Sequence, residues 1–568
     1  MPGQTGRFAL IEQLVADGFS YMFGNPGTVE QGFLDALEDY PDLKYILTLQ
    51  ESIAVLVADG YARATKRPTL VQIHSSPGVG NAIGNLYQAK RGGAPLVVIA
   101  GESGIRYDAM DAQMAADLVA MARPVTKWAT RIVDPGSVLR VLRRAIKIAA
   151  TPPTGPVFVC LPADVLDAPR EEEVVPTSIP DTRVQPQPDA IHAAAAVLAG
   201  AQRPMVIMGD GVAMSGAQPE LAKVAELIGA DVWGANSSEV NIAYDHPLYR
   251  GSLGHMFGSF SQPITSQADV VLIVGTYVFP EVFPAMSAVF APGAQVIHVD
   301  LDSYEIAKNF PVDIGLAADP KATLREIATA LEQLQSPAQR DGAAARVKQA
   351  GAATSHAHDA GKEADRGNWD ASPMRPPRFM AELAGRLPPD AIIFDEALTA
   401  SGDVTRYIVP RTPGTFFQTR GGSLGVGIPG AIGVKLANPD KVVVGFTGDG
   451  GSMYTIQALW TAAHHKVGAK FVICNNHSYK LLKLNVQQYW RDNRLPERDF
   501  PNPFDIRDPD LDFVGLAQAM GVPGAKVERP EQIGPAIEQM LATDGPFLID
   551  LVVSNDVPQH FVYHRGGQ

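Results

Sequence analysis

The chain is poor in cysteine, in long apolar runs and in positive charge, and each shortage excludes a class of protein. Only Cys160 and Cys474 are present, both inside apolar segments, so a disulfide framework and a cysteine metal site are not expected. No run of about eighteen apolar residues occurs and the N-terminus lacks a signal-peptide core, which predicts a soluble, cytoplasmic protein. The formal net charge of −14 argues against nucleic acid or a membrane surface as a partner.

What the chain contains is the composition of a large globular protein, with 568 residues, 46% of them hydrophobic and 19% charged. Apolar strand-like segments alternate with helix-like segments in three successive stretches. This alternation predicts an α/β fold of three doubly wound parallel-sheet domains. We place an N-terminal domain at 1–185, a middle domain at 189–335, a linker at 336–375, a C-terminal domain at 376–555 and a tail at 556–568.

Residues 445–476 carry the strongest local signal. An apolar strand runs into a Gly-Asp-Gly turn centred on Asp449, and after a helix-length segment a second apolar strand ends in Asn475-Asn476. Parallel strands joined by a crossover helix end at the same sheet edge, so Asp449 and Asn476 are expected to converge on one cation. Their oxygens suit Mg²⁺, with a diphosphate as the remaining ligand and glycines that let the backbone approach it. A Gly-Asp-Gly sequence alone usually marks only a turn, and the asparagine pair strengthens the assignment.

These residues resemble the diphosphate and metal motif of the thiamin-diphosphate-dependent enzymes. Residues 23–30 (FGNPGTVE), the segment LQES around Glu51 and residues 73–84 (IHSSPGVGNAIG) resemble the part of that family which binds the pyrimidine ring. The combination of FGNPG, the His-Ser pair at 74–75 and ALWTAA at 458–463 is most similar to the benzoylformate decarboxylases within the family. The resemblance covers nearly the whole chain and implies thiamin diphosphate and Mg²⁺ as cofactors.

For the C-terminal domain, the resemblance implies that Asp449 and Asn476 hold the metal together with the backbone carbonyl of Ser478. It also implies cofactor contacts for Thr399, Gly448, Gly450, Gly451, Ser452 and Tyr479. Gly422 and Leu424 match the segment that touches the pyrimidine ring and props the cofactor into its bent conformation. A bulky apolar side chain such as that of Leu424 suits this propping role.

In the N-terminal domain, the candidates for catalysis are Glu51, His74, Thr28 and Gln113. Glu51 stands at a helix start, where an acidic residue also favours the helix dipole, but the resemblance implies that it hydrogen-bonds the cofactor's aminopyrimidine ring. His74 ends a strand, where histidines are often structural, but it matches the family's proton-transferring histidine. The turn before Thr28, implied to face the reacting carbon, consists of Asn25, Pro26 and Gly27. Benzoylformate decarboxylases carry serine at the position of Thr28.

Three departures from the benzoylformate decarboxylases leave a second function open. At the position of their second active-site histidine this chain has Val282. His255, elsewhere in the middle domain, is the candidate that could compensate for it. Gln113 matches a position where carboligating relatives keep glutamine and benzoylformate decarboxylases have an apolar residue. Finally, Gln418 and Arg420 predict a substrate wall that is more polar than an aryl group requires.

The sequence therefore predicts a 2-oxo acid decarboxylase or C–C lyase of the benzoylformate decarboxylase type. The alternative is an acetolactate-synthase-like carboligase or a 2-hydroxyacyl-CoA lyase, which FAD or an ADP-type ligand in the middle domain would favour, although we do not expect one. A nucleotide-binding module or an inactive relative is a third interpretation, against which intact Glu51, Asp449 and Asn476 argue. The family further implies a homodimer or homotetramer with active sites at the subunit interface, so that Glu51 and Asp449 of one site come from separate chains.

Overall fold

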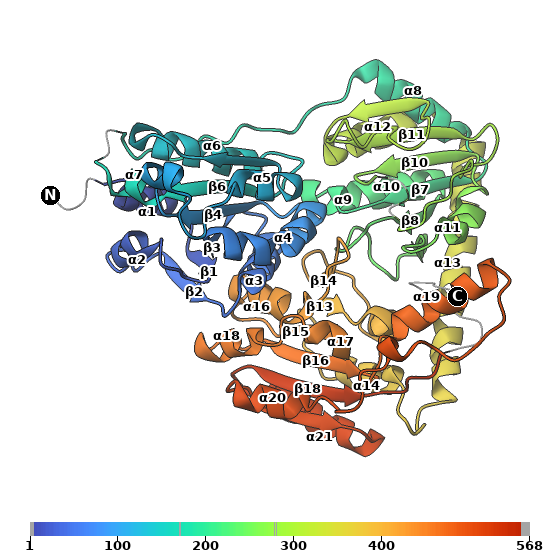
Figure 1. Ribbon diagram of the computed structural model, residues 1–568. Coiled ribbons are helices and arrows are strands. Elements are labelled where there is room, and N and C mark those ends of the chain that lie inside the picture. The colour runs from blue at the N-terminus through green and yellow to red at the C-terminus, as the bar shows by residue number, and fades with distance from the viewer. Residues whose placement is uncertain (1–4, 170–171, 278, 280, 558–568) are drawn as a thin grey trace.

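A computed structural model describes residues 5–169, 172–277, 279 and 281–557 of the chain. Three six-stranded sheets follow one another along the sequence, each with helices against its faces (Figure 1). Within the described residues, every pair of neighbouring strands is parallel, which confirms the predicted fold class. No helix in this part of the chain has the length and apolar character needed to cross a membrane.

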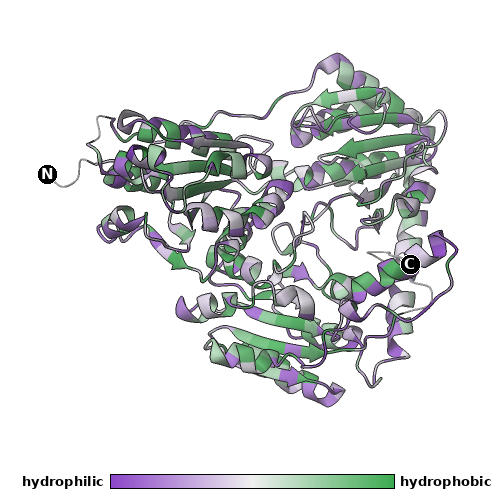
Figure 2. Ribbon diagram, viewed as in Figure 1, coloured by the Kyte–Doolittle hydropathy of each residue, from purple (hydrophilic) through white to green (hydrophobic). Residues whose placement is uncertain are grey.

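The N-terminal sheet has the strand order β2-β1-β3-β4-β6-β5. Its strands are β1 (Tyr21–Gly24), β2 (Lys44–Leu47), β3 (Thr69–His74), β4 (Leu96–Glu102), β5 (Trp128–Arg131) and β6 (Val157–Pro162). The accompanying helices are α1 (Gly6–Ala16), α2 (Gln31–Leu37), α3 (Glu51–Thr65), α4 (Ser75–Gly92), η2 (Ile105–Met110), α5 (Leu118–Ala122), η3 (Arg123–Val125), η4 (Pro135–Ser137), α6 (Val138–Ala150) and α7 (Ala163–Asp167). The central strands are nearly continuous apolar runs because helices cover both faces of the sheet (Figure 2).

The middle sheet has the strand order β12-β11-β10-β7-β8-β9. Its strands are β7 (Pro204–Met208), β8 (Asp231–Gly234), β9 (Tyr249–Ser252), β10 (Val270–Val274), β11 (Gln295–Asp300) and β12 (Ile314–Ala317). Its helices are α8 (Pro188–Gly200), α9 (Gly211–Ser215), α10 (Gln218–Ile228), α11 (Gly258–Thr265) and α12 (Pro320–Leu334). Most of the stretch that we predicted as a linker then forms one 30-residue helix, α13 (Pro337–Arg366), which starts with a capping box at Ser336.

The C-terminal sheet has the strand order β14-β13-β15-β16-β18-β17. Its strands are β13 (Ile392–Glu396), β14 (Phe416–Gln418), β15 (Val443–Gly448), β16 (Lys470–Asn475), β17 (Gly524–Val527) and β18 (Phe547–Val552). Its helices are α14 (Pro376–Ala384), η5 (Leu398–Ala400), α15 (Ser401–Tyr407), α16 (Gly427–Ala437), α17 (Asp449–Ser452), α18 (Ala458–His464), α19 (Lys480–Asp492), η6 (Asn502–Phe504), α20 (Phe513–Ala519), η7 (Pro530–Gln532) and α21 (Ile533–Ala542).

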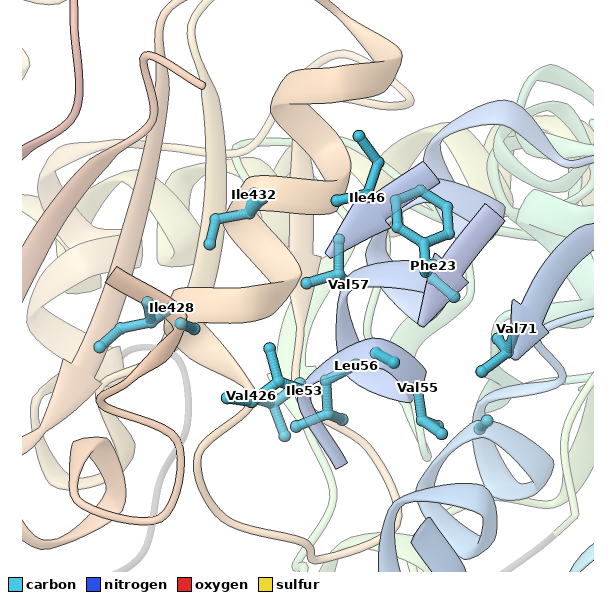
Figure 3. Packing of buried hydrophobic residues seen from close by; sticks show 14 of the residues in the cluster. Phe23, Ile46, Ile53, Val55, Leu56, Val57, Val71, Val426, Ile428 and Ile432 are labelled. Carbon is cyan, nitrogen blue, oxygen red and sulfur yellow. The ribbon is translucent and has the colours of Figure 1, made fainter. Parts of the chain in front are cut away.

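The N-terminal and C-terminal domains share a hydrophobic core in which α3 packs against α16 (Figure 3). Glycines bring the two helices close together, because a Cβ added to Gly60 would lie 2.2 Å from the carbonyl oxygen of Gly430. In the same way, a Cβ on Gly433 would lie 2.0 Å from the carbonyl oxygen of Val57. Any larger side chain at these glycines would push the helices apart, so the two sheets are held in one relative position.

Candidate active site

Glu51 begins α3 and is only 7% exposed. Asn81 on α4 donates a hydrogen bond from Nδ2 to Glu51 Oε2 at 3.0 Å. Gly78, also on α4, leaves room for the carboxylate, since a Cβ there would lie 2.8 Å from Glu51 Oε1. Glu51 is therefore held by α4 at the carboxyl edge of the N-terminal sheet, and does not extend into solvent as an ordinary first-turn acid would.

His74 ends β3 and packs directly against the turn that contains Gly27. Its Nδ1 lies 2.9 Å from Glu30 Oε2, and Glu30 Oε1 accepts a hydrogen bond of 3.0 Å from the amide of Gly101. A Cβ on Gly27 would lie 1.9 Å from His74 Nδ1, so only glycine leaves space for the ring. Because an ionised carboxylate only accepts hydrogen bonds, Nδ1 carries a proton when Glu30 is ionised, which leaves Nε2 for a substrate.

Glu30 is a site residue that the sequence analysis missed. Burial raises the pKa of its carboxyl, and the hydrogen bond and charge of His74 lower it in part. Partial burial also raises the pKa of Tyr45, and the charges of Glu30 and Glu51 raise it further, so both carboxylates lie near this half-buried tyrosine. The available signal was the position of Glu30 in the FGNPGTVE motif, but its partner lies on a different strand.

The other candidates of the N-terminal domain lie at the rim of the same edge. Asn25 donates from Nδ2 to the carbonyl of Thr48 at 2.8 Å, which ties the turn to the end of β2. Thr28 and Gln113 are both exposed. The residue after Gln113 accepts a hydrogen bond of 2.8 Å from Ser76 Oγ through its carbonyl, so this loop borders the start of α4. Pro26 is exposed on the same turn.

Asp449, Asn476 and Ser478 come together at the carboxyl edge of the C-terminal sheet. Asp449 is 3% exposed, and its Oδ2 accepts hydrogen bonds from the amides of Asn476 at 2.9 Å and Ser478 at 3.2 Å. Its Oδ1 accepts from the amide of Gly450 at 2.7 Å. Burial raises the pKa of the Asp449 carboxyl, and these backbone donors lower it in part.

The same three residues fit a magnesium ion. Asn476 Oδ1 is buried and has no hydrogen-bond partner within the described residues. An orphaned amide oxygen beside a buried carboxylate is what a cation that prefers oxygen ligands requires. The described residues contain no cluster of three His, Cys, Asp or Glu side chains suited to a metal. The ion would therefore depend on amide, carbonyl and phosphate oxygens.

The backbone around Asp449 is also shaped for a diphosphate. A Cβ on Gly450 would lie 2.4 Å from the ring of Tyr479, whereas the space around the equivalent point on Gly448 is open. Gly451 and Ser452 are buried, and Ser452 Oγ donates to the carbonyl of Asp449 at 2.7 Å. Small residues thus keep side chains away from the amides of this turn.

Gly422 and Leu424 lie on the loop between β14 and α16. Gly422 has φ +82°, a conformation that favours glycine, and Leu424 is half-buried. The loop ends in two amides that bind one buried carboxylate. Gly425 donates to Glu396 Oε1 at 2.6 Å, and Gly427 donates to Glu396 Oε2 at 2.7 Å.

Glu396 also joins this loop to the diphosphate motif, and the sequence analysis missed it. Thr447, two residues before Asp449, donates from Oγ1 to Glu396 Oε2 at 3.0 Å. Burial raises the pKa of the Glu396 carboxyl to about 7, against the effect of its hydrogen-bond donors. Thr399 follows on η5, which contacts α19 just beyond Tyr479.

The predicted polar substrate wall is wrong. Gln418 donates from Nε2 to Asp395 Oδ2 at 2.7 Å, and Arg420 donates to Asp210 Oδ2 at 2.8 Å. Both side chains are therefore engaged by buried carboxylates inside the protein. For Arg420 the strand-end pattern gave no information on this, because its partner Asp210 belongs to another domain. Val282, at the expected position of the second histidine, is 57% exposed.

The structure thus gathers one set of candidates in each terminal domain. No hydrogen bond or ion pair within the described residues joins Glu51 or His74 to Asp449, Asn476 or Ser478. The origin of the two sets from different subunits stays a prediction.

Three family models match successive parts of the chain. The N-terminal TPP binding domain of thiamine pyrophosphate enzymes matches residues 4–121, the central domain matches 191–327, and the C-terminal TPP binding domain matches 399–551. The chain belongs to the thiamin-diphosphate-dependent enzymes. Thiamine pyrophosphate is another name for thiamin diphosphate, so the two terminal matches cover the two residue sets described above.

Relatives within this family have different activities. Benzoylformate decarboxylase of Pseudomonas aeruginosa is 30% identical over 96% of this chain and 98% of its own length. Acetolactate synthase of Mycobacterium bovis is also 30% identical, over 97% of this chain and 88% of its own length. The solved 4-hydroxybenzoylformate decarboxylase of Rhodococcus jostii RHA1 superposes with a TM-score of 0.83 at 28% identity, covering 97% of this chain and 99% of that one. Identity alone therefore does not separate decarboxylase from carboligase.

An FAD or ADP-type ligand in the middle domain belongs to the alternative function, and we do not expect one. Ligands of open α/β sheets bind where the strand order reverses, which in this domain is between β7 and β10. Here the amide of Gly211 donates to the carbonyl of Gly275 at 2.9 Å, and a Cβ on Gly211 would lie 2.5 Å from Gly275 Cα. The backbone segments that follow β7 and β10 are thus in direct contact with each other at the point where this crevice begins.

Proposed function

We propose that this thiamin-diphosphate-dependent enzyme is a 2-oxo acid decarboxylase or C–C lyase of the benzoylformate decarboxylase type. The observation that carries the proposal is the His74–Glu30 pair at the same sheet edge as Glu51. Cleavage of a 2-oxo acid leaves a carbon that must be protonated before an aldehyde is released. A histidine with one nitrogen fixed by a carboxylate and the other free is suited to deliver that proton.

When bound, thiamin diphosphate supplies the nucleophilic carbon and takes up the electrons released by carbon–carbon cleavage. Asp449, Asn476 and the carbonyl of Ser478 would hold Mg²⁺, and the turn at Gly450 would hold the diphosphate. Glu51 would hydrogen-bond the aminopyrimidine ring, with Asn81 keeping its carboxylate in place. All of these groups are preorganised by the fold.

The rim residues would orient the substrate. Glu30 would keep one proton on His74 Nδ1, so that Nε2 takes up a second proton and delivers it from the imidazolium to the substrate. Thr28 is exposed and directly follows Gly27, against which this ring packs, and its hydroxyl would donate to the substrate carboxylate. Gln113 would contribute an amide from the neighbouring loop.

We further propose a cytoplasmic homodimer or homotetramer whose active sites lie at subunit interfaces. In such an assembly each site combines the Glu51 set of one subunit with the Asp449 set of another. No hydrogen bond or ion pair between described residues joins the two sets within one chain, which is compatible with this arrangement.

The second candidate function is an acetolactate-synthase-like carboligase or a 2-hydroxyacyl-CoA lyase. Two observations favour it: the glutamine at position 113 is exposed at the rim, and valine occupies position 282 where a second histidine is expected. The equal identity to an acetolactate synthase is compatible with it. The polar wall no longer counts in its favour, because Gln418 and Arg420 are engaged elsewhere.

A substrate panel tests the two functions. The enzyme, loaded with thiamin diphosphate and Mg²⁺, is given benzoylformate, 4-hydroxybenzoylformate or pyruvate, with and without an aldehyde acceptor. A decarboxylase releases CO₂ and aldehyde in equal amounts, whereas a carboligase forms a hydroxyketone or hydroxy acid that depends on the acceptor. The Glu51→Ala protein is the control. If no 2-oxo acid yields either CO₂ or a ligation product, the decarboxylase proposal is overturned.

A further inference from the structure

The middle domain contacts the start of the loop that carries Gly422 and Leu424. Residues 238–239 of the middle domain form an antiparallel bridge between Glu239 and Phe417 at the end of β14. The amide of Gln418 donates to the carbonyl of Ser238 at 2.7 Å. Backbone of the middle domain thus pairs with β14, the edge strand of the C-terminal sheet, just before the loop begins.

Asp210, just after β7, is the fixed point of this contact. Its Oδ1 accepts hydrogen bonds from the amides of Ser238 at 2.9 Å and Glu239 at 3.1 Å, and from Asn241 Nδ2 at 2.9 Å. The side chain is 2% exposed. Although burial works to raise the pKa of this carboxyl, the charges of Arg420 and Arg63 and its hydrogen bonds hold the pKa below its usual range.

Arg420 connects this fixed carboxylate to the loop. Its guanidinium lies 2.8 Å from Asp210 Oδ2 and its side chain is 11% exposed. The next two residues, Gly421 and Gly422, have φ +77° and +82°, so the chain reverses directly after the ion pair. Glu396 fixes the other end of the same loop through two amides.

We infer that the Asp210–Arg420 ion pair makes the middle domain a positioning element of the cofactor site, by fixing the start of the loop 421–425 that presents Leu424. This inference rests on the proposed function, which assigns that loop to the cofactor. Asp210 and Arg420 act through the loop, since neither is expected to touch the cofactor. A buried guanidinium without its carboxylate would leave this position, and the loop would move with it.

The chain contains a matched control at the same domain boundary. Arg411 of the C-terminal domain pairs with Asp245 of the middle domain at 2.6 Å, but the two side chains are 61% and 46% exposed. Exposed ion pairs contribute little, because solvent screens them. Asp245→Asn therefore removes an ion pair between the same two domains without removing a fixed point of the loop.

The first measurement is cofactor affinity. Cofactor-free wild type, Asp210→Asn, Arg420→Met and Asp245→Asn are titrated with thiamin diphosphate at constant Mg²⁺ by calorimetry. Asp210→Asn and Arg420→Met are expected to raise the Kd about tenfold or more, with Asp245→Asn within about twofold of wild type. Arg420→Lys keeps the charge but loses the planar fork, so it should fall between these limits.

The second measurement does not need the cofactor. Hydrogen exchange of peptides covering residues 419–427 is compared in the cofactor-free proteins, and these peptides should exchange faster in Asp210→Asn and Arg420→Met only. Unchanged exchange, or equal acceleration in Asp245→Asn, would overturn the inference. Failure of the wild type to bind thiamin diphosphate would instead overturn the proposed function, while the exchange result would still decide whether Asp210 holds the loop. If Asp210→Asn does not fold, Arg420→Lys decides both measurements.

Discussion

The N-terminal and C-terminal sheets have the same topology, but their carboxyl edges carry different chemistry. Counted from its own first strand, each sheet runs in the order 2-1-3-4-6-5. The third strand ends in His74 in one sheet and leads into Asp449 in the other. The N-terminal edge gathers titratable groups, to which we assign proton exchange, and the C-terminal edge gathers oxygens that suit a cation. The same topology thus presents two different sets of residues at its strand ends.

The comparison extends to one buried glutamate in each sheet. Glu30 follows β1 and faces the imidazole of His74, whereas Glu396 ends β13 and accepts hydrogen bonds from two amides and a hydroxyl. Burial raises the pKa of both carboxyls. A carboxylate opposite an imidazole has a partner with which it can share a proton, while one opposite fixed donors anchors backbone. The partners, more than burial, decide the role.

Glu51→Gln should have the largest effect on the proton-exchanging edge. Glutamine keeps the size of the side chain but cannot hold the aminopyrimidine ring as the carboxylate does, so turnover should fall by about 10²–10⁴-fold. Cofactor content, measured by thiochrome fluorescence, should stay close to that of wild type. Undiminished turnover would refute the role of Glu51, and parallel loss of cofactor would erase the distinction between the two edges.

Asp449→Asn should show the opposite pattern at the cation-binding edge. Loss of the buried carboxylate removes a metal ligand, so the Kd for thiamin diphosphate at constant Mg²⁺ should rise by about 10- to 100-fold. Turnover should recover in part at saturating cofactor. Glu531→Gln, at an exposed ion pair of the same domain, is the control and should bind cofactor like wild type. Equal affinities of the Asp449 and Glu531 variants would contradict the metal site.

How well the sequence predicts a site residue depends on how far along the chain its interaction partners lie. Asp449 and Asn476 directly follow successive strands of one crossover unit, so their convergence follows from local pattern and the parallel-sheet rule. Glu30 and Glu396 bind partners contributed by later elements, and only the assembled sheets bring these together. For the same reason Arg420 was misassigned to a substrate wall, since its partner lies in the middle domain.

Glu30→Gln should reduce kcat/KM by about tenfold near neutral pH and change its pH dependence. In wild type, activity should fall as the pH drops through the raised pKa of Glu30, because a neutral carboxyl no longer offers His74 a negatively charged partner. Glutamine does not titrate, so that decline should be absent from the variant's profile. In a double-mutant cycle with His74→Asn the two losses should not add, and additive losses would show that the residues act separately.

Glu396→Gln should have the smallest effect and should act on stability. Because the carboxyl has a folded-state pKa of about 7, above its unfolded value, its contribution to the free energy of unfolding is present below the unfolded pKa and is lost as pH rises through the folded one. Glutamine does not titrate, so the Tm of the cofactor-free variant should change less than that of wild type between about pH 5 and pH 8.

The variant should therefore be less stable than wild type at the acidic end of that range and approach it at the alkaline end. Glu538→Gln, at a side chain that is 70% exposed, is the control and should follow the wild-type profile. Parallel profiles for wild type and Glu396→Gln would mean that Glu396 does not titrate in this range. The anchoring glutamate of the C-terminal sheet would then differ from Glu30 in protonation as well as in partners, and the contrast between the two edges would be sharper than burial alone implies.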